Sequence, residues 1–307
     1  MASSAAPVKK VLVPIAAGSE PVEASVPIDI LRRAGADVTV ASAGDDLLVE
    51  VMYGVRIVAD ARVADCADAS YDLVVLPVRL LVLLVDVLSC LRRRRVQGGI
   101  PGAENLGGCA ALEGIVKRHA EKGGLCAAIC AAPAMAFGPW GLLDGHKATA
   151  HPAFVEKFPP EVTAVDANVV VDGKVVTSRG PATAMEFALT LVEQLYGKDK
   201  VEQIAKPMLV RHEPGYTIKE LNPVQWQCNG TPKVLVPLAD ANEEMEVIMI
   251  IDALRRAKAD VVVASAEDKL EIAARYGMRV VTDMSLDDAA EQQFDLIVVP
   301  ASRRSCP

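Results

Sequence analysis

The chain has 307 residues, of which 51% are hydrophobic and 23% charged, and its formal net charge is -8. This composition supports a sizeable apolar core and argues against an intrinsically disordered protein. The acidic balance argues against a nucleic-acid-binding surface, which would need clustered basic residues.

The seven cysteines show no metal-ligand spacing, so we expect neither a metal site nor a disulfide framework. Cysteine usage of this kind is typical of a reducing, intracellular compartment. The first ten residues contain no apolar segment of the kind that a secretory signal requires. We therefore predict a cytoplasmic protein, and the sequence leaves a nuclear or plastid location open.

The first elements of the chain are an apolar strand from Val11, an amphipathic helix and a second strand over 38–41. Beyond these, the patterns predict a strand over 73–76, a helix near 105–121, a strand over 125–129, a helix after Cys130, a hairpin over 169–177 and a helix over 182–196. Strands that alternate with helices predict a parallel, doubly wound α/β sheet.

The chain then repeats itself. Val234 follows Val11 by 223 residues, and the same offset aligns Tyr53 with Tyr276 without a gap. We predict a complete domain over 9–200, a polar linker over 201–232 and a second, incomplete copy over 233–307. At this offset the equivalents of Cys130 and His151 would fall beyond residue 307, so the second copy is not expected to hold a site of the same kind.

An irregular segment interrupts the first copy over 78–97. Its apolar part is about half the length that a membrane span needs, and Asp86 interrupts it, so no membrane segment is predicted. The arginine run 92–95 is typical of a solvated surface. Because valine codons begin GT and glutamine codons can end AG, we interpret 78–97 as an in-frame retained intron. If no transcript is found that lacks this insert, the interpretation is wrong.

Five motifs occur in an order that resembles the ThiJ/PfpI superfamily. They are Gly18-Ser-Glu-Pro-Val-Glu23, Gly98-Gly-Ile-Pro-Gly-Ala-Glu-Asn105, Ala128-Ile-Cys-Ala-Ala-Pro133, His151-Pro152 and Thr177-Ser-Arg-Gly-Pro181. The match is closest to the branch of the Parkinson-disease protein deglycase, in its plant tandem-domain form. The resemblance implies a flavodoxin-like, class I glutamine amidotransferase-like fold, in which helices sandwich a parallel sheet. It also implies proteins that are often homodimers.

Cys130 is the predicted nucleophile. It lies where an apolar strand turns into a helix, at the sheet edge where open α/β proteins bind ligands. We expect the helix N-terminus to favour the reactive thiolate. From spacing alone, a buried structural cysteine is an equal alternative, and the resemblance favours the nucleophile. The backbone N–H of Ala131 is a candidate oxyanion donor.

The resemblance assigns three further roles. Glu23 matches the family's acid, which would bind Cys130 and move a proton, while Glu20 serves better as the cap of the helix. His151 matches a histidine near the cysteine. Gly98 and Gly99 match a glycine pair that approaches the substrate, with the Gly99 amide as a second oxyanion donor.

The implied activity is that of a glutathione-independent glyoxalase (glyoxalase III), which converts methylglyoxal into D-lactate, or of a protein deglycase. Its substrates would be methylglyoxal, glyoxal or glycated protein adducts, and no cofactor is required. A peptidase would place a histidine directly after the nucleophile, where this chain has Ala131. Two alternatives stay open: a redox-sensing or chaperone-like protein that uses the same cysteine, and a splice form inactivated by the insert. His119 and His146 are expected to be solvated.

Overall fold

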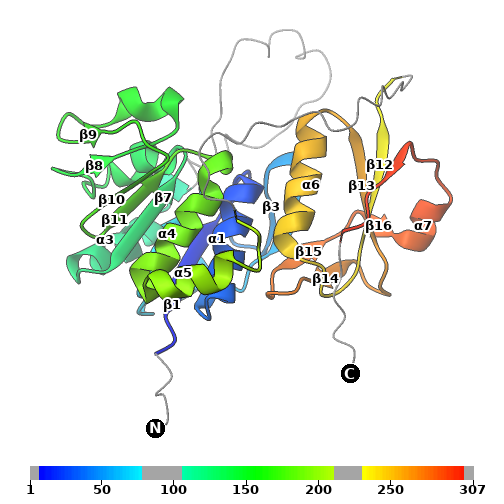
Figure 1. The fold of residues 1–307 in the computed structure, drawn as a ribbon, viewed down its shortest axis with the longest axis horizontal. Helices are drawn as coiled ribbons and strands as arrows, with labels where there is room; N and C mark the ends of the chain where they lie inside the picture. Colours follow the sequence, from blue (N-terminus) through cyan, green and yellow to red (C-terminus); the bar gives the residue numbers. More distant parts are fainter. Residues whose placement is uncertain (1–6, 78–105, 211–229, 301–307) are drawn as a thin grey trace.

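The two sequence repeats form two α/β units that lie side by side (Figure 1). The structure is a computed structural model that describes residues 7–77, 106–210 and 230–300. The segment 78–97, interpreted above as an insert, lies outside the described residues.

The sheet of the first repeat has seven strands, in the order β10-β11-β7-β6-β1-β2-β5. Their bounds are β1 (Lys10–Ile15), β2 (Asp37–Ser42), β5 (Ala61–Arg62), β6 (Leu73–Leu76), β7 (Leu125–Ile129), β10 (Val169–Asp172) and β11 (Val175–Ser178). All neighbouring strands are parallel except the hairpin of β10 and β11. The predicted parallel α/β sheet is therefore confirmed.

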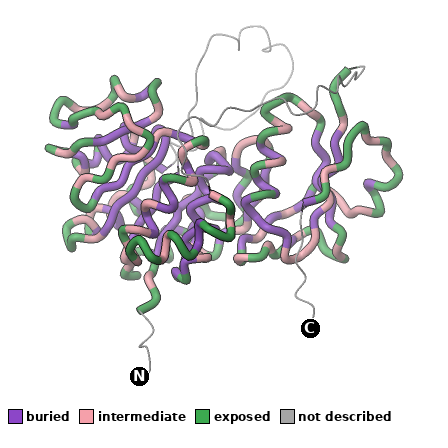
Figure 2. Tube along the Cα trace, in the orientation of Figure 1, coloured by how far each residue is buried: buried purple, intermediate pink, exposed green. Residues whose placement is uncertain are grey.

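Helices cover both faces of this sheet, which explains why its strands are apolar on both sides. Residues Val11, Val13 and Ile15 of β1 belong to the core under α1 and α4, whereas Leu12 belongs to the opposite core under α3. The helices are α1 (Pro21–Arg33), α3 (Ala110–Glu121), α4 (Ala184–Tyr196) and α5 (Lys198–Ala205). Figure 2 shows the sheet and α1 as the most deeply buried part. Helix α5 extends into the start of the expected linker.

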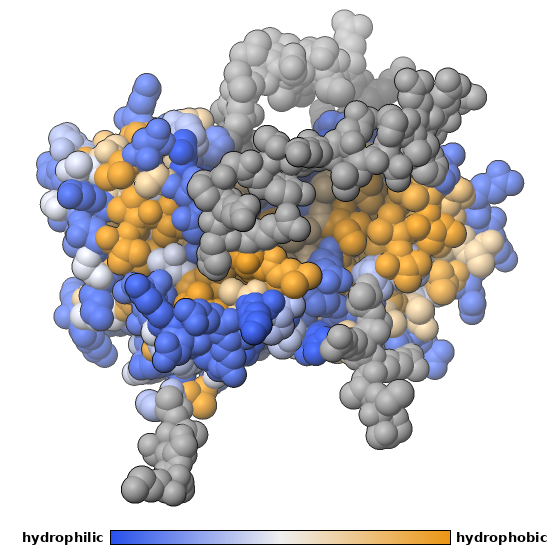
Figure 3. Space-filling model, viewed as in Figure 1, coloured by the Kyte–Doolittle hydropathy of each residue, from blue (hydrophilic) through white to orange (hydrophobic). Residues whose placement is uncertain are grey.

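The second repeat builds a smaller sheet in the order β16-β13-β12-β17. Its elements are β12 (Lys233–Leu238), α6 (Glu244–Arg256), β13 (Asp260–Ser265), β16 (Met284–Ser285), α7 (Leu286–Ala290) and β17 (Leu296–Ile297). Among the described strands, β17 pairs with β12 on one side only, and Ile297 is 57% exposed. Apolar side chains consequently reach the surface over this repeat (Figure 3).

A small antiparallel sheet joins the repeats. Its strands, in spatial order, are β14 (Glu271–Ala273), β15 (Arg279–Val281), β4 (Arg56–Val58) and β3 (Leu48–Glu50). In the pairing of β4 with β15, Ile57 lies opposite Val280, its own equivalent in the other repeat. A local two-fold axis therefore passes between these two residues. A separate two-stranded sheet is formed by β8 (Lys147–Ala148) and β9 (Thr163–Ala164).

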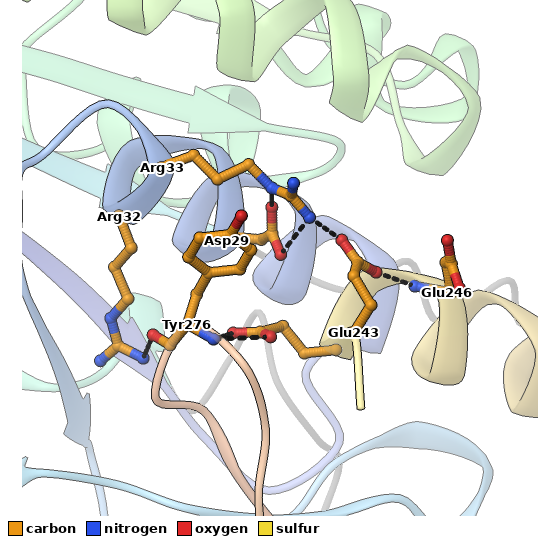
Figure 4. A network of polar contacts seen from close by, with 7 residues as sticks. Asp29, Arg32, Arg33, Glu243, Glu246 and Tyr276 are labelled. Carbon is orange, nitrogen blue, oxygen red and sulfur yellow. Dashed lines mark hydrogen bonds and ion pairs between the residues drawn. The ribbon is translucent and has the colours of Figure 1, made fainter. Parts of the chain in front are cut away.

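Polar contacts between α1 and α6 obey the same two-fold relation. Arg33 pairs with Glu243, and its equivalent Arg256 pairs with Glu20. Arg32 donates to the carbonyl oxygen of Tyr276 at 3.0 Å, and its equivalent Arg255 donates to that of Tyr53 at 2.7 Å. Figure 4 shows the half of this interface that contains Arg33. The second repeat thus packs on the first as an isologous partner does in a symmetric dimer.

Candidate active site

Cys130 lies directly after β7, at the carboxyl end of the parallel strands. Its backbone adopts φ +67°, a conformation that non-glycine residues rarely adopt. Two backbone hydrogen bonds hold it there: Cys130 N–H donates to Ser178 at 2.9 Å, and its carbonyl oxygen accepts from His151 at 2.8 Å. The side chain is therefore presented by a rigid turn, as predicted, although it is only 2% exposed.

Glu23 approaches Cys130 from the first turn of α1. Glu20 caps this helix, as expected, because its carboxylate accepts the backbone N–H of Glu23 at 2.6 Å. The Glu23 side chain is fully buried, and its carboxyl group lies near enough to Cys130 to raise the pKa of the thiol. The structure therefore brings the predicted nucleophile and the predicted acid together.

The protonation of Cys130 differs from the expectation of a thiolate favoured by a helix N-terminus. Burial raises the pKa of the Cys130 thiol, the Glu23 carboxylate raises it further, and the N–H of Ala131 lowers it. The segment after the cysteine is a five-residue π-helix, Pro133–Phe137, which is too short to supply the dipole of a full helix. Burial at this position therefore favours the neutral thiol over the thiolate.

His151 borders the pair through its backbone and its ring. Its Nδ1 accepts the N–H of Ala153 at 3.3 Å, which assigns the ring proton to Nε2. Burial and the nearby Arg179 cation lower the pKa of His151, so the ring is neutral at pH 7. A neutral imidazole with a free Nε2–H can donate a hydrogen bond to a substrate oxygen.

Gly180 is a site residue that sequence reasoning did not single out. A Cβ atom at this position would lie 3.7 Å from Cδ2 of His151 and 3.8 Å from Oε1 of Glu23. The absence of a side chain thus leaves room between the acid and the imidazole. The signal was present in the Thr177-Ser-Arg-Gly-Pro181 motif, which was used for the resemblance alone. Gly98 and Gly99 lie outside the described residues.

Other features of the described chain lie apart from this site. His119 is buried and bonds the carbonyl oxygen of Leu125 at 2.9 Å, so the expectation that it is solvated is wrong. Its ring packs against Gly124, where an added Cβ would overlap Cε1 of the imidazole. A cavity of about 480 Å³ that Lys9 and Asp72 help to line opens at the amino ends of the strands, opposite Cys130. Across 7–77, 106–210 and 230–300, no His, Cys, Asp and Glu cluster could hold a metal ion.

No helix in the described ranges is long and apolar enough to cross a membrane. The fold and the site together define a flavodoxin-like α/β protein with a cysteine on a strained turn and a buried glutamate beside it. The model of the DJ-1/PfpI family matches residues 9–77, 96–194 and 232–305, so it covers both repeats and leaves 78–95 unmatched. The chain belongs to this family.

Several proteins resemble the chain. "Protein DJ-1 homolog B" of Arabidopsis thaliana is 50% identical over 95% of the chain, and the chain spans 63% of that protein's length. The solved structure "Toxoplasma gondii DJ-1, oxidized" is 41% identical, with a TM-score of 0.57 over 66% of this chain and 98% of that one. A Caenorhabditis elegans relative, "Glutathione-independent glyoxalase DJR-1.2", is 30% identical over 62% of the chain and 90% of its own length.

Proposed function

We propose that the chain is a glutathione-independent glyoxalase that converts methylglyoxal into D-lactate, and that the same site acts on glycated protein adducts. The observation that carries the proposal is the proximity of the buried Glu23 carboxyl to Cys130, whose backbone is strained at φ +67°. The glyoxalase among the relatives supports the reaction class. The roles are nucleophile for Cys130, acid and base for Glu23, and oxygen donors for His151 and Ala131.

The reaction is written from the thiol, because burial favours the uncharged sulfur. As the Cys130 sulfur attacks the aldehyde carbon, Glu23 takes the thiol proton and passes it to the carbonyl oxygen, which gives a hemithioacetal. The Ala131 N–H and the Nε2–H of His151 stabilise the charge that develops on oxygen.

The second half moves hydrogen between the two carbons. Glu23 removes the proton from the former aldehyde carbon and an enediol forms; a proton then returns to the neighbouring carbon. The aldehyde carbon is thereby oxidised to a thioester while the ketone carbon is reduced to an alcohol. Water cleaves the thioester, releasing lactate and the free thiol. Atoms and electrons balance within the substrate plus one water, so no external oxidant is needed.

The test is D-lactate production from methylglyoxal in the absence of glutathione, measured on the full chain. Cys130→Ser and Glu23→Gln should each lower the rate at least about a hundredfold, the usual contribution of a positioned acid–base group or nucleophile. The matched controls are Cys109→Ser, at a half-buried cysteine of the other face, and Glu246→Gln, at the exposed equivalent of Glu23. Both controls should retain the wild-type rate.

Three outcomes would overturn or replace the proposal. Turnover that persists in Cys130→Ser would refute the mechanism. If the full chain is inactive and deletion of 78–97 restores turnover, the chain is a disabled splice form of the enzyme. If neither protein turns over and peroxide converts Cys130 into the sulfinate, the redox-sensing alternative is favoured.

A further inference from the structure

One buried carboxylate connects the cysteine site to the second repeat. Glu20 is 3% exposed and binds a group from each repeat. Its Oε2 accepts the backbone N–H of Glu23 at 2.6 Å, and its Oε1 pairs with Nη2 of Arg256. Arg256 belongs to the last turn of α6. A cation of one repeat therefore holds the residue that caps the helix of the catalytic glutamate in the other.

The guanidinium of Arg256 is fixed by further contacts. Its Nε donates to Asp252 at 2.6 Å, and its plane lies 4.7 Å from the ring centre of Tyr53. The planar fork of arginine can satisfy both carboxylates at once, which the single ammonium of lysine cannot do with the same geometry. Arg256 thus presents one nitrogen to Glu20 in a defined direction.

We infer that Arg256 is a positioning residue for the Cys130–Glu23 pair and acts through Glu20. Glu23 lies in the first turn of α1, which the Glu20 carboxylate fixes by capping. Without Arg256, the buried Glu20 carboxylate loses its cationic partner and is driven to turn away from the cap. The inference rests on the proposed function only for its turnover measurement.

The charge of Arg256 is expected to influence the reactivity of Cys130 in the same direction as its positioning of Glu20. Five charged or titratable groups face one another here: Glu20 and Glu23 at the start of α1, Tyr53, and Asp252 and Arg256 from α6. Glu20 raises the pKa of the Cys130 thiol, and Arg256 offsets the Glu20 charge. At pH 9, Glu20 is ionised, because its pKa is about 7. Loss of Arg256 should therefore raise the pKa of Cys130 and slow its reaction as a thiolate.

The two-fold relation supplies a matched control. Arg33 pairs with Glu243, which caps α6 through the N–H of Glu246 at 2.6 Å (Figure 4). Glu246 is exposed, and none of the cysteines in the described residues belongs to its repeat. The Arg33 side chain is 16% exposed and that of Arg256 38%, so removing Arg33 should cost the interface at least as much stability. Of these two arginines, Arg256 is the one that pairs with Glu20, the cap of the helix that contains Glu23.

The experiment compares Arg256→Met with Arg33→Met in the full chain. Alkylation of Cys130 by iodoacetamide is followed by peptide mass spectrometry from pH 7 to 10, alongside D-lactate production. Arg256→Met should slow alkylation at pH 9 by about threefold to tenfold, the factor expected for half to one unit of pKa. Arg33→Met should stay within about twofold of wild type, a change below a third of a pKa unit.

Equal rates for the two variants, or an unchanged rate in Arg256→Met, would overturn the inference. If a methionine variant does not fold, Arg256→Gln and Arg33→Gln decide in the same way, because glutamine also removes the charge and keeps a polar group at the interface. If the wild type makes no D-lactate yet the alkylation rates differ as expected, the proposed function fails and the positioning role of Arg256 stands.

Discussion

The backbone N–H of His151 donates a hydrogen bond to the carbonyl oxygen of Cys130 at 2.8 Å. The two residues are therefore held together by main chain, independently of their side chains. The backbone carbonyl oxygen of Ser178 accepts the N–H of Cys130 at 2.9 Å, which holds Cys130 from a second segment. Because two separate segments hold this one residue, the structure can maintain a strained backbone at the reactive cysteine.

That strain has a measurable consequence. At φ +67°, Cys130→Gly should be more stable than Cys130→Ala by about 1 kcal/mol, since glycine adopts this conformation without steric cost. The free energies of unfolding in urea give the comparison. The control is Cys126 on β7, whose φ is negative, where alanine should be the more stable substitution. The same order at both positions would show that residue 130 carries no strain.

Gly180 should control access between Glu23 and His151. A Cβ fits at ordinary contact distance, so Gly180→Ala should fold normally and keep most of the Cys130 alkylation rate. Gly180→Leu would fill the space, and we expect it to lower that rate at least about tenfold, the effect of misplacing or blocking a reacting group. Thermal unfolding of both variants separates access from stability. If Cys130 is alkylated at the full rate in a folded Gly180→Leu variant, the reagent reaches the cysteine by another route.

The carboxylates at the repeat interface should make stability depend on pH. Burial raises the pKa of Glu20 from 4.5 to about 7 and that of Asp29 from 3.8 to about 7. Groups whose pKa is raised by folding stabilise the protein at low pH, and this contribution is lost as pH rises through 7. The melting temperature should therefore fall between pH 5 and pH 8, and fall less in Glu20→Gln. Identical pH slopes in wild type and variant would contradict the assignment.

His119 should behave as a packed core residue. A Cβ at Gly124 would overlap its imidazole ring, so Gly124→Ala should destabilise the fold by about 2 kcal/mol. At Gly123 there is open space but a positive φ, and alanine there should cost about 1 kcal/mol from the backbone alone. Adding His119→Ala should recover stability in the Gly124 variant and not in the Gly123 variant. The measurement is again urea unfolding.

Much of the first repeat could be predicted because its signals are local. The bounds predicted for β6 and β7 are those observed, since short apolar runs flanked by polar or glycine residues define buried strands. The hairpin of β10 and β11 followed from Asp172-Gly173 in the same way. Helix α5 was missed, because its eight residues include two lysines and only three apolar residues.

The candidate site was only partly readable from the sequence. The order of motifs placed Cys130, Glu23 and His151 together, and the structure brings them together. The burial of His119 and the contact of Gly180 with two site residues had no local signal. The pKa of Cys130 was predicted in the wrong direction, because a helix terminus is visible in sequence and the desolvation of a thiol is not.

The sequence by itself determined the repeat, the strands and the position of the cysteine after β7, because apolar periodicity and turn residues act over a few neighbours. Only the tertiary structure decided that Arg256 meets Glu20, 236 residues away, and that Glu23 is buried beside Cys130 while its equivalent Glu246 is exposed. Burial and charge pairing depend on which distant segments pack together, and that packing sets the chemistry of the thiol.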